Sequence, residues 1–424
     1  MSPAQPVGDP LPGTGELPPQ VAAPAPDGNE RPFSVYLHVP YCRVRCGYCD
    51  FNTYTNLSMG RGASAEDFVG TLAGELRATR RAMDAAGLPV RRAQTVFVGG
   101  GTPTMLPASD LVKMLDLVRE CFGLAPDAEV TTEANPDSVD EAGLAVLARG
   151  GFTRVSFGMQ SAVPHVLKVL ERTHEPARVP RVVEWARRTG LSTSLDLIYG
   201  APGESLEDWQ RSLDAVAQIG PDHVSAYALV IEEGTRMWGQ VRRGELPMPE
   251  DDDEATKYEM ADAALGRAGY EWYEISNWAR PGAQCRHNRA YWLDWDWWGA
   301  GPGAHSHLGD VRLWNTKHPV AWAGQIAAGR LPVAGHEVID AGSRELERIM
   351  LGIRLREGIA LASLGGASIS SSDDVGAPPS HLVPVVAGLV ADELLDAGAA
   401  MRGRAVLTLR GRLMADTVTR TLTQ

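Results

Sequence analysis

The segment YLHVPYCRVRCGYCDF, residues 36–51, places three cysteines within eight positions, directly after an apolar and β-branched run. The 424-residue chain contains only two further cysteines. Five cysteines are too few and too uneven for a disulfide framework, and such a cluster in a reducing compartment indicates metal binding or catalysis. The spacing C-x3-C-x2-C therefore predicts a metal centre on Cys42, Cys46 and Cys49.

Two kinds of metal centre use clustered cysteines. A structural zinc site closes four ligands around the ion, typically as two separated pairs. Here three ligands come from one short loop, and Cys121 and Cys285 lie far along the chain. A [4Fe–4S] cluster held by three cysteines leaves one iron open to another ligand, which explains the count directly. We expect the cluster rather than zinc, and we assign no role to Cys121.

A regular alternation of strand and helix patterns surrounds this loop. Apolar, β-branched runs fall at 34–39, 95–100, 129–134, 154–159, 192–199 and 223–231, with helical patterns at 65–86, 109–122, 177–189 and 205–219. Near-continuous apolar strands separated by helices predict an α/β fold with a parallel sheet, closed or partly closed like a TIM barrel. We therefore expect a partial (β/α)6 barrel.

The barrel prediction also locates the chemistry, because active sites of such barrels form at the carboxyl ends of the strands. The cysteine loop follows the first predicted strand, and GGGTPT (99–104) follows the second. Glu133 ends the third strand, Gln160 follows the fourth, and Asp196 lies within the fifth. Polar residues at five successive strand ends indicate one shared site.

Composition divides the chain into four segments. Residues 1–30 are rich in Pro, Gly and Ala and are predicted to be disordered. The barrel is expected over 31–270, ending with a helix opened by the acidic run at 249–265. The segment 271–340 holds eight of the eleven tryptophans. The last segment, 341–424, is expected to be a small helical, winged-helix-like domain with helices near 344–356 and 381–398 and a Gly/Ser-rich loop near 361–380.

The cysteine motif after the first barrel strand resembles the signature of the radical S-adenosylmethionine (SAM) superfamily. A closer resemblance is to the family of oxygen-independent coproporphyrinogen oxidases and their heme-chaperone relatives. It covers the chain from about Phe33 to the C-terminus. Its motifs run in order as YLHVPYC, CGYCDF, VFVGGGTPT, TTEANP, RVSFGMQS, LERTH, SLDLIYGAPGES and AYALVIEEGT.

The resemblance implies the cofactors and their contacts. Cys42, Cys46 and Cys49 would hold a [4Fe–4S] cluster whose open iron binds the amino and carboxylate groups of SAM. The predicted SAM contacts are Tyr36, Gly100, Gly101 and Thr102 toward the methionine moiety, and Glu133, Gln160, Arg172 and Asp196 at polar positions. Carboxylates can hold ribose hydroxyls or the amino group, and an arginine can bind a carboxylate bidentately. Without the family, Arg172 is typical of a surface arginine.

Two features separate an oxidase from a chaperone within this family. In the oxidases the third cysteine is followed after one residue by a fourth, whereas here Asp50 is followed by Phe51, the chaperone pattern. The stretch HNRAYW (287–292) matches the H-N-x-x-Y-W motif associated with heme binding in the chaperones. His287 could ligate heme iron axially, and Tyr291 and Trp292 could pack on the porphyrin.

Other interpretations of the same residues stay open. Cys285, His305 and His307 are alternative iron ligands, and the tryptophans could simply form core where two domains meet. We predict a heme chaperone that passes heme to an acceptor hemoprotein, without coproporphyrinogen oxidase activity. The alternatives are the oxidase itself and a radical SAM enzyme with another substrate.

Charge and hydropathy limit the partners. The net charge of −13 and the pI near 5.3 disfavour a nucleic-acid partner, because such binding depends on clustered Lys and Arg. No run of 18 apolar residues predicts a transmembrane segment, and no basic residue or signal-like apolar core precedes Arg31. We expect a soluble cytoplasmic protein, with a homodimer as one option for its oligomeric state.

Overall fold

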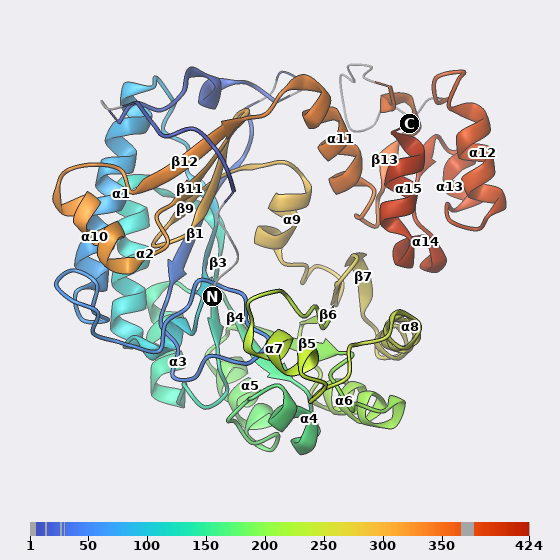
Figure 1. Ribbon diagram of the computed structural model, residues 1–424, viewed down its shortest axis with the longest axis horizontal. Helices are drawn as coiled ribbons and strands as arrows, with labels where there is room; N and C mark the ends of the chain where they lie inside the picture. Colours follow the sequence, from blue (N-terminus) through green and yellow to red (C-terminus); the bar gives the residue numbers. More distant parts are fainter. Residues whose placement is uncertain (1–5, 13–14, 26–27, 29, 366–376, 424) are drawn as a thin grey trace.

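Six parallel strands, each followed by helix, form the centre of the molecule, as the computed structural model shows (Figure 1). It describes residues 6–12, 15–25, 28, 30–365 and 377–423. The strands are β1 (Phe33–Val39), β2 (Ala93–Gly100), β3 (Leu124–Ala134), β4 (Arg154–Gln160), β5 (Ser192–Tyr199) and β6 (His223–Ala228). The helices between and after them are α1 (Phe68–Ala85), α2 (Ala108–Cys121), α3 (Glu141–Gly150), α4 (Pro164–Val169), α5 (Arg178–Arg188) and α6 (Leu206–Ile219). The predicted partial (β/α)6 barrel is confirmed.

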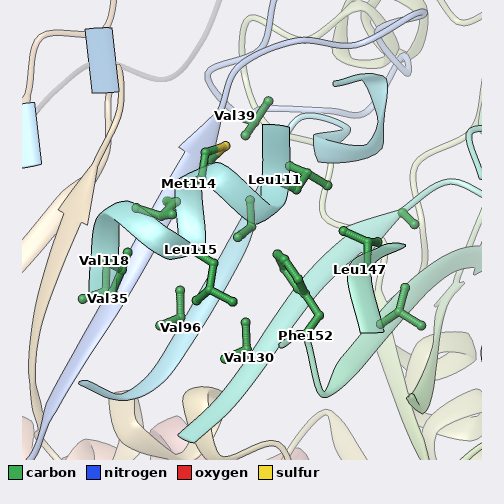
Figure 2. Close-up of a cluster of buried hydrophobic side chains, with 14 of the residues drawn as sticks. Val35, Val39, Val96, Leu111, Met114, Leu115, Val118, Val130, Leu147 and Phe152 are labelled. Atoms are coloured by element: carbon green, nitrogen blue, oxygen red, sulfur yellow. The ribbon is translucent and has the colours of Figure 1, made fainter. Parts of the chain in front are cut away.

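The outer face of the barrel is held by close apolar packing against the helices. Figure 2 shows Val35 of β1 and Val96 of β2 beneath Leu115 and Val118 of α2, and all four side chains are fully buried. Leu111, Leu115 and Val118 recur at helical spacing, so one stripe of α2 faces the sheet. The inner face of the same strands is left for polar side chains.

The tryptophan-rich segment extends the barrel sheet at both edges. At one edge β9 (Asp296–Ala300) pairs parallel with β1, and β10 (His305–Leu308), β11 (Val311–Asn315) and β12 (Val333–Val338) continue it antiparallel. At the other edge β8 (Asn277–Ala279) and β7 (Glu271–Glu274) follow β6. Trp278, Trp298 and Trp322 are fully buried, so much of the aromatic cluster is core.

A buried carboxylate joins the barrel to this extension. Glu75 of α1 accepts hydrogen bonds from the backbone N–H of Gly301 at 2.9 Å, Nδ2 of Asn315 at 2.6 Å and Nε1 of Trp322 at 2.8 Å. Trp322 belongs to α10 (Pro319–Ala327), which packs beside α1. The side chain of Glu75 therefore ties α1 to three positions of the extension that are more than 200 residues further along the chain.

The described part of residues 1–30 differs from the predicted disorder. Pro19–Ala22 form a short 3-10 helix, Leu17 and Val21 are buried, and the backbone of Asp9 pairs with His336 of β12. Composition misled the prediction, because two apolar anchors and one edge-strand pairing fix a segment that is otherwise Pro- and Gly-rich.

The C-terminal residues form a separate helical lobe with a small sheet, shown in orange to red in Figure 1. It contains α11 (Ala341–Gly352), β13 (Ile359–Ala360), α12 (Val383–Ala391), α13 (Ala397–Met401), β14 (Arg404–Ala405), α14 (Leu409–Leu413) and α15 (Ala415–Leu422). The helix predicted at 381–398 is two helices, because Glu393 takes a positive φ of 59° and Asp396 caps α13. Residues 366–376 of the predicted loop lie outside the described residues.

Three further helices follow the barrel strands, and the last of these strands is shorter than predicted. α7 (Arg236–Arg242) and α8 (Asp251–Arg267) follow β6, whose strand ends at Ala228 rather than at 231. α9 (Arg286–Trp292) lies between β8 and β9. No helix in the described ranges has the length and apolar character needed to cross a membrane.

Candidate functional site

A cavity of about 540 Å³ opens inside the barrel, and it is lined by every residue predicted for the cluster or SAM and by His287, the first candidate for heme iron. These residues are Tyr36, Cys42, Cys46, Cys49, Gly100, Gly101, Thr102, Glu133, Gln160, Arg172, Asp196 and His287. They come from β1 to β5, the loops after β1 and β2, the segment after α4, and α9. The structure thus brings the predicted residues together, while their individual roles stay predictions.

The three thiols stand on the loop after β1, each beside a hydrogen-bond donor. Thr102 Oγ1 lies 3.8 Å from Cys42 Sγ, Arg172 Nη1 lies 3.7 Å from Cys46 Sγ, and Thr53 Oγ1 lies 3.9 Å from Cys49 Sγ. Donors stabilise a thiolate, the form in which cysteine binds a metal. The donor set therefore fits a cluster that takes one sulfur from each cysteine.

Burial controls the protonation of these thiols. It raises the pKa of Cys42 to about 11 and also raises the pKa of Cys49. Both are thiols at neutral pH until a metal replaces the proton, so loading a cluster here releases protons. Within the described part of the chain, no group of three His, Cys, Asp or Glu side chains converges on one point as a single metal ion would require.

The glycine loop after β2 is pressed against the cysteine loop. Gly101 N donates to Val39 O and Thr102 N donates to Tyr41 O, both at 2.8 Å. A Cβ on Gly101 would lie 2.6 Å from Tyr41 O and 3.0 Å from Cys42 Sγ. Gly100 has a positive φ of 106°. Only glycine fits this approach of two loops, so these residues do more than make a tight turn.

Two carboxylates face the cavity from β3 and β5, the strands on either side of β4. Glu133 Oε2 accepts from Gly100 N at 3.1 Å, and both oxygens of Asp196 accept from Ser156 Oγ at 2.9 Å. Burial, and then the nearby Asp196, raise the pKa of Glu133 to about 8, while burial also raises the pKa of Asp196. A cationic or hydroxyl-bearing ligand would relieve this burial of negative charge.

Gln160 and Arg172 are positioned by unusual backbone and by an asparagine that the sequence prediction missed. Gln160 has a positive φ of 61° at a bulge between β4 and β5, which turns its side chain into the cavity. Arg172 Nη2 donates to Asn135 Oδ1 at 2.5 Å and to Gly158 O at 3.0 Å. Asn135 also donates to Thr102 Oγ1 at 3.3 Å, and so links three of the motifs.

Helix α9, which carries HNRAYW, forms the inner end of the cavity. His287 is 2% exposed, and its ring stacks on Phe97 with 5.2 Å between centroids. Its Nδ1 lies 2.6 Å from Thr95 Oγ1, and its Nε2 lies 3.0 Å from the hydroxyl of Tyr291. Burial lowers the pKa of His287 to about 3, so the ring is neutral.

The tautomer of His287 follows from its neighbours. The hydroxyl of Thr95 donates to Ser34 Oγ at 2.9 Å, so Thr95 accepts the proton of Nδ1. Nε2 therefore carries the lone pair, which accepts from Tyr291. An iron atom could use this lone pair only after the tyrosine hydroxyl has moved away.

The alternative ligands fall in different places. Cys285 is buried and lines the cavity, and its Sγ donates to Glu129 Oε1 at 3.5 Å. Burial raises the pKa of Cys285 to about 12. His307 is buried 3.5 Å from Asp294, and His305 is exposed; neither lines the cavity, nor does Trp292. Of the porphyrin-packing residues predicted from the motif, Tyr291 alone lies at the cavity.

Several cavity residues were missed although the sequence contained a signal. Arg154, Ser156, Gly158 and Gln160 alternate along β4 and all line the cavity. Side chains two apart point to the same face of a strand, so the placement of Gln160 also predicts that of Arg154.

Comparison with known proteins agrees with this geometry. Residues 36–216 match the Radical SAM superfamily, and the barrel with its cysteine loop defines a radical SAM protein. The chain is 48% identical to the heme chaperone HemW of Mycobacterium tuberculosis over 413 residues, which are 97% of each chain. It is 37% identical to heme chaperone HemW of Escherichia coli, over 68% of this chain and 75% of the relative. The chain belongs to the HemW family.

A solved structure supports the fold. Coproporphyrinogen III oxidase HemN from Escherichia coli, described as a radical SAM enzyme, aligns with a TM-score of 0.76 over 96% of this chain and 92% of its own. The two sequences are 22% identical, so this likeness concerns the fold alone.

Proposed function

We propose that the protein binds heme and transfers it to an acceptor hemoprotein, while carrying a [4Fe–4S] cluster on Cys42, Cys46 and Cys49 and SAM beside it. The observation that carries the chaperone assignment is the residue at the mouth of the cavity. Phe51 lines the cavity and is 58% exposed, at the position where the oxidase pattern has a cysteine. Relatives named as heme chaperones support the same assignment.

The cavity supports the cofactor part of this proposal. When bound, the cluster supplies an open iron for the amino and carboxylate groups of SAM. Gly100 and Gly101 leave the backbone bare for the methionine end of the ligand. Arg172 is held by Asn135 and can add a carboxylate partner, while Glu133 and Asp196 offer acceptors for amino or hydroxyl groups.

For heme, Nε2 of His287 is the iron ligand that we propose. Its lone pair is directed at the hydroxyl of Tyr291, so heme binding requires this tyrosine to withdraw. A neutral imidazole is the form that ligates iron, and burial keeps His287 neutral. The competing ligands are Cys285 in the cavity and the exposed His305 outside it.

The test is an anaerobic titration of the cluster-loaded protein with heme, beside an assay for conversion of coproporphyrinogen to protoporphyrinogen with SAM and reductant. Saturable binding near one heme per chain without conversion is expected. Conversion at a catalytic rate would make the protein an oxidase, and the absence of heme binding would end the chaperone proposal.

The transfer step needs its own measurement. Heme-loaded protein mixed with an apo-hemoprotein should lose its Soret absorbance as the acceptor gains one, and we propose that this occurs in the cytoplasm. Sedimentation of the loaded protein would decide between a monomer and the homodimer that we keep as an option.

A further inference from the structure

Arg154 is a buried cation at the inner end of the cavity. It is the first residue of β4, is 4% exposed and lines the cavity. Its Nη1 donates to Ala283 O at 3.2 Å, and its buried Nε has no hydrogen-bond partner among the described residues. A guanidinium offers five N–H donors, so most of its capacity is unused.

The other buried arginines show what is missing. Arg31 and Arg412 are 5% and 6% exposed. Arg31 lies 3.0 Å from a carboxylate oxygen of Asp294, and Arg412 lies 2.8 Å from one of Asp262. Within the residues that the structure describes, Arg154 has no carboxylate oxygen within 4.0 Å. A buried charge is costly without an ionic partner, so an anion from outside the chain is the natural complement.

The nearest carboxylates are already engaged elsewhere. Glu129 accepts from the backbone N–H groups of Arg286 and His287 at 3.0 and 2.9 Å. Asp196, the other carboxylate whose charge acts on Arg154, accepts from Ser156 Oγ at 2.9 Å. None of these contacts involves Arg154, and moving a carboxylate to it would break hydrogen bonds in a buried site.

Arg154 lies at the opposite end of β4 from the predicted SAM contact Gln160, although another predicted SAM contact, Asp196, is near enough for its carboxylate to raise the pKa of Arg154. Gln160 stands at the other end of β4, six residues further on, which corresponds to about 20 Å of extended strand. Around Arg154 the cavity is lined by Ser194, His223 and Asn288, all near the amino ends of the strands or on α9. One arginine, Arg172, lies near the cysteines, and a second lies at the opposite end.

We infer that Arg154 binds a carboxylate of a second ligand, at the end of the cavity remote from the loop that carries Cys42, Cys46 and Cys49. The ligand group that this site would bind is a carboxylate, paired with the guanidinium of Arg154. A heme propionate is one source, and this choice of source rests on the proposed function. The site itself rests only on the unpaired guanidinium and the cavity.

The first experiment uses propionate and its neutral isostere propionamide as probes in thermal melts of the full chain. Propionate should stabilise the wild type, and propionamide should not. In Arg154→Met the propionate concentration for half-maximal stabilisation should rise about 10–100-fold, the loss expected for charge-assisted hydrogen bonds. Arg286→Met, which removes a surface arginine paired with Asp127, is the matched control and should respond like the wild type.

Equal effects of propionate and propionamide on the wild type would overturn the inference without recourse to any variant. So would a folded Arg154→Met that responds to propionate as the wild type does. If Arg154→Met does not fold, Arg154→Lys keeps the charge, and a partial response is then expected.

The second experiment identifies the source of the carboxylate. Heme and heme dimethyl ester are titrated into wild type and Arg154→Met. Weaker binding of heme in the variant, with unchanged binding of the ester, would assign a heme propionate to Arg154. Unchanged heme binding beside a lost propionate response would keep the carboxylate site and reject heme as its source. No heme binding by the wild type would refute the proposed function and leave the propionate result to decide on Arg154.

Discussion

The carboxylate of Glu75 lends itself to a quantitative prediction. Both of its oxygens accept hydrogen bonds: Oε2 accepts from Gly301 N and Trp322 Nε1, and Oε1 accepts from Asn315 Nδ2. An amide NH₂ group in the place of either oxygen would therefore face a donor. In Glu75→Gln one oxygen becomes an NH₂ group that opposes a donor. Leaving one buried donor unsatisfied costs about 1–3 kcal/mol, so the free energy of unfolding should fall by that amount. Glu75→Ala removes an acceptor from three donors and should cost about 3 kcal/mol or more.

The assay is equilibrium denaturation followed by tryptophan fluorescence, since Trp322 is itself a partner of Glu75. Glu120→Gln is the control, because Glu120 pairs with Arg77 at the surface, with both side chains about half exposed. Exposed pairs contribute about 0–1 kcal/mol. Equal losses for Glu75→Gln and Glu120→Gln would refute the reasoning.

The same side chain predicts a pH dependence. Burial, against the opposing effect of its three donors, raises the pKa of Glu75 from 4.5 to about 7. A carboxyl group with a raised pKa holds its proton more tightly in the folded state than in the unfolded state. Its contribution to stability is therefore full below pH 4.5 and is lost as the pH rises to 7. Glu75→Gln should remove this part of the slope, and an unchanged slope would show that the titrating group lies elsewhere.

Five other substitutions test separate parts of the molecule. Cys46→Ala should abolish the iron–sulfur absorbance of anaerobically reconstituted protein, whereas unchanged iron and sulfide content would exclude this cysteine as a ligand. Gly101→Ala should weaken SAM binding measured by calorimetry, because its Cβ would lie 2.6 Å from a backbone oxygen of the cysteine loop; equal affinity would contradict the role of that contact. Lys257→Met leaves a buried glutamate without its cation, 3.3 Å away, and should cost about 3–5 kcal/mol in denaturation, so a loss under 1 kcal/mol would argue against a buried ion pair. Tyr291→Phe frees Nε2 of His287 and should tighten heme binding, while His287→Ala should weaken it; identical titrations would move the iron ligand to Cys285 or His305.

The sequence predicted the barrel well because its strands carry near-continuous apolar runs. It missed α3, a short helix of ten residues. It also missed the strands of the extension, which have three to six residues and little periodicity. Their pairing depends on long-range register, such as β9 against β1, which no local pattern encodes. The same reason explains the N-terminal stretch, where the partner of Asp9 lies at His336.

The sequence predicted which residues form the site better than it predicted how they contact one another. The residues predicted to contact the cluster and SAM, together with His287, line one cavity, whereas Trp292 does not. The motifs could not indicate that His287 is buried between Thr95 and Tyr291. Those contacts depend on how α9 docks against β2, a tertiary feature. The alternation of side chains along β4 indicates Arg154, because it lies an even number of residues before Gln160.

The position of α9 gives the two halves of the proposed function a physical connection. The helix that carries HNRAYW closes the inner end of the same cavity whose mouth is bordered by the cysteine loop. A ligand at His287 and Arg154 would therefore share one enclosed space with a ligand at Arg172, without competing for the same cation. Filling either part removes water from the other and strengthens its electrostatic contacts, because such contacts are stronger in a drier site. Heme affinity should thus rise when SAM is present, and by linkage SAM affinity should rise by the same factor when heme is present. Affinities that are independent of each other would mean that heme binds outside this cavity, with His305 as the first ligand to examine.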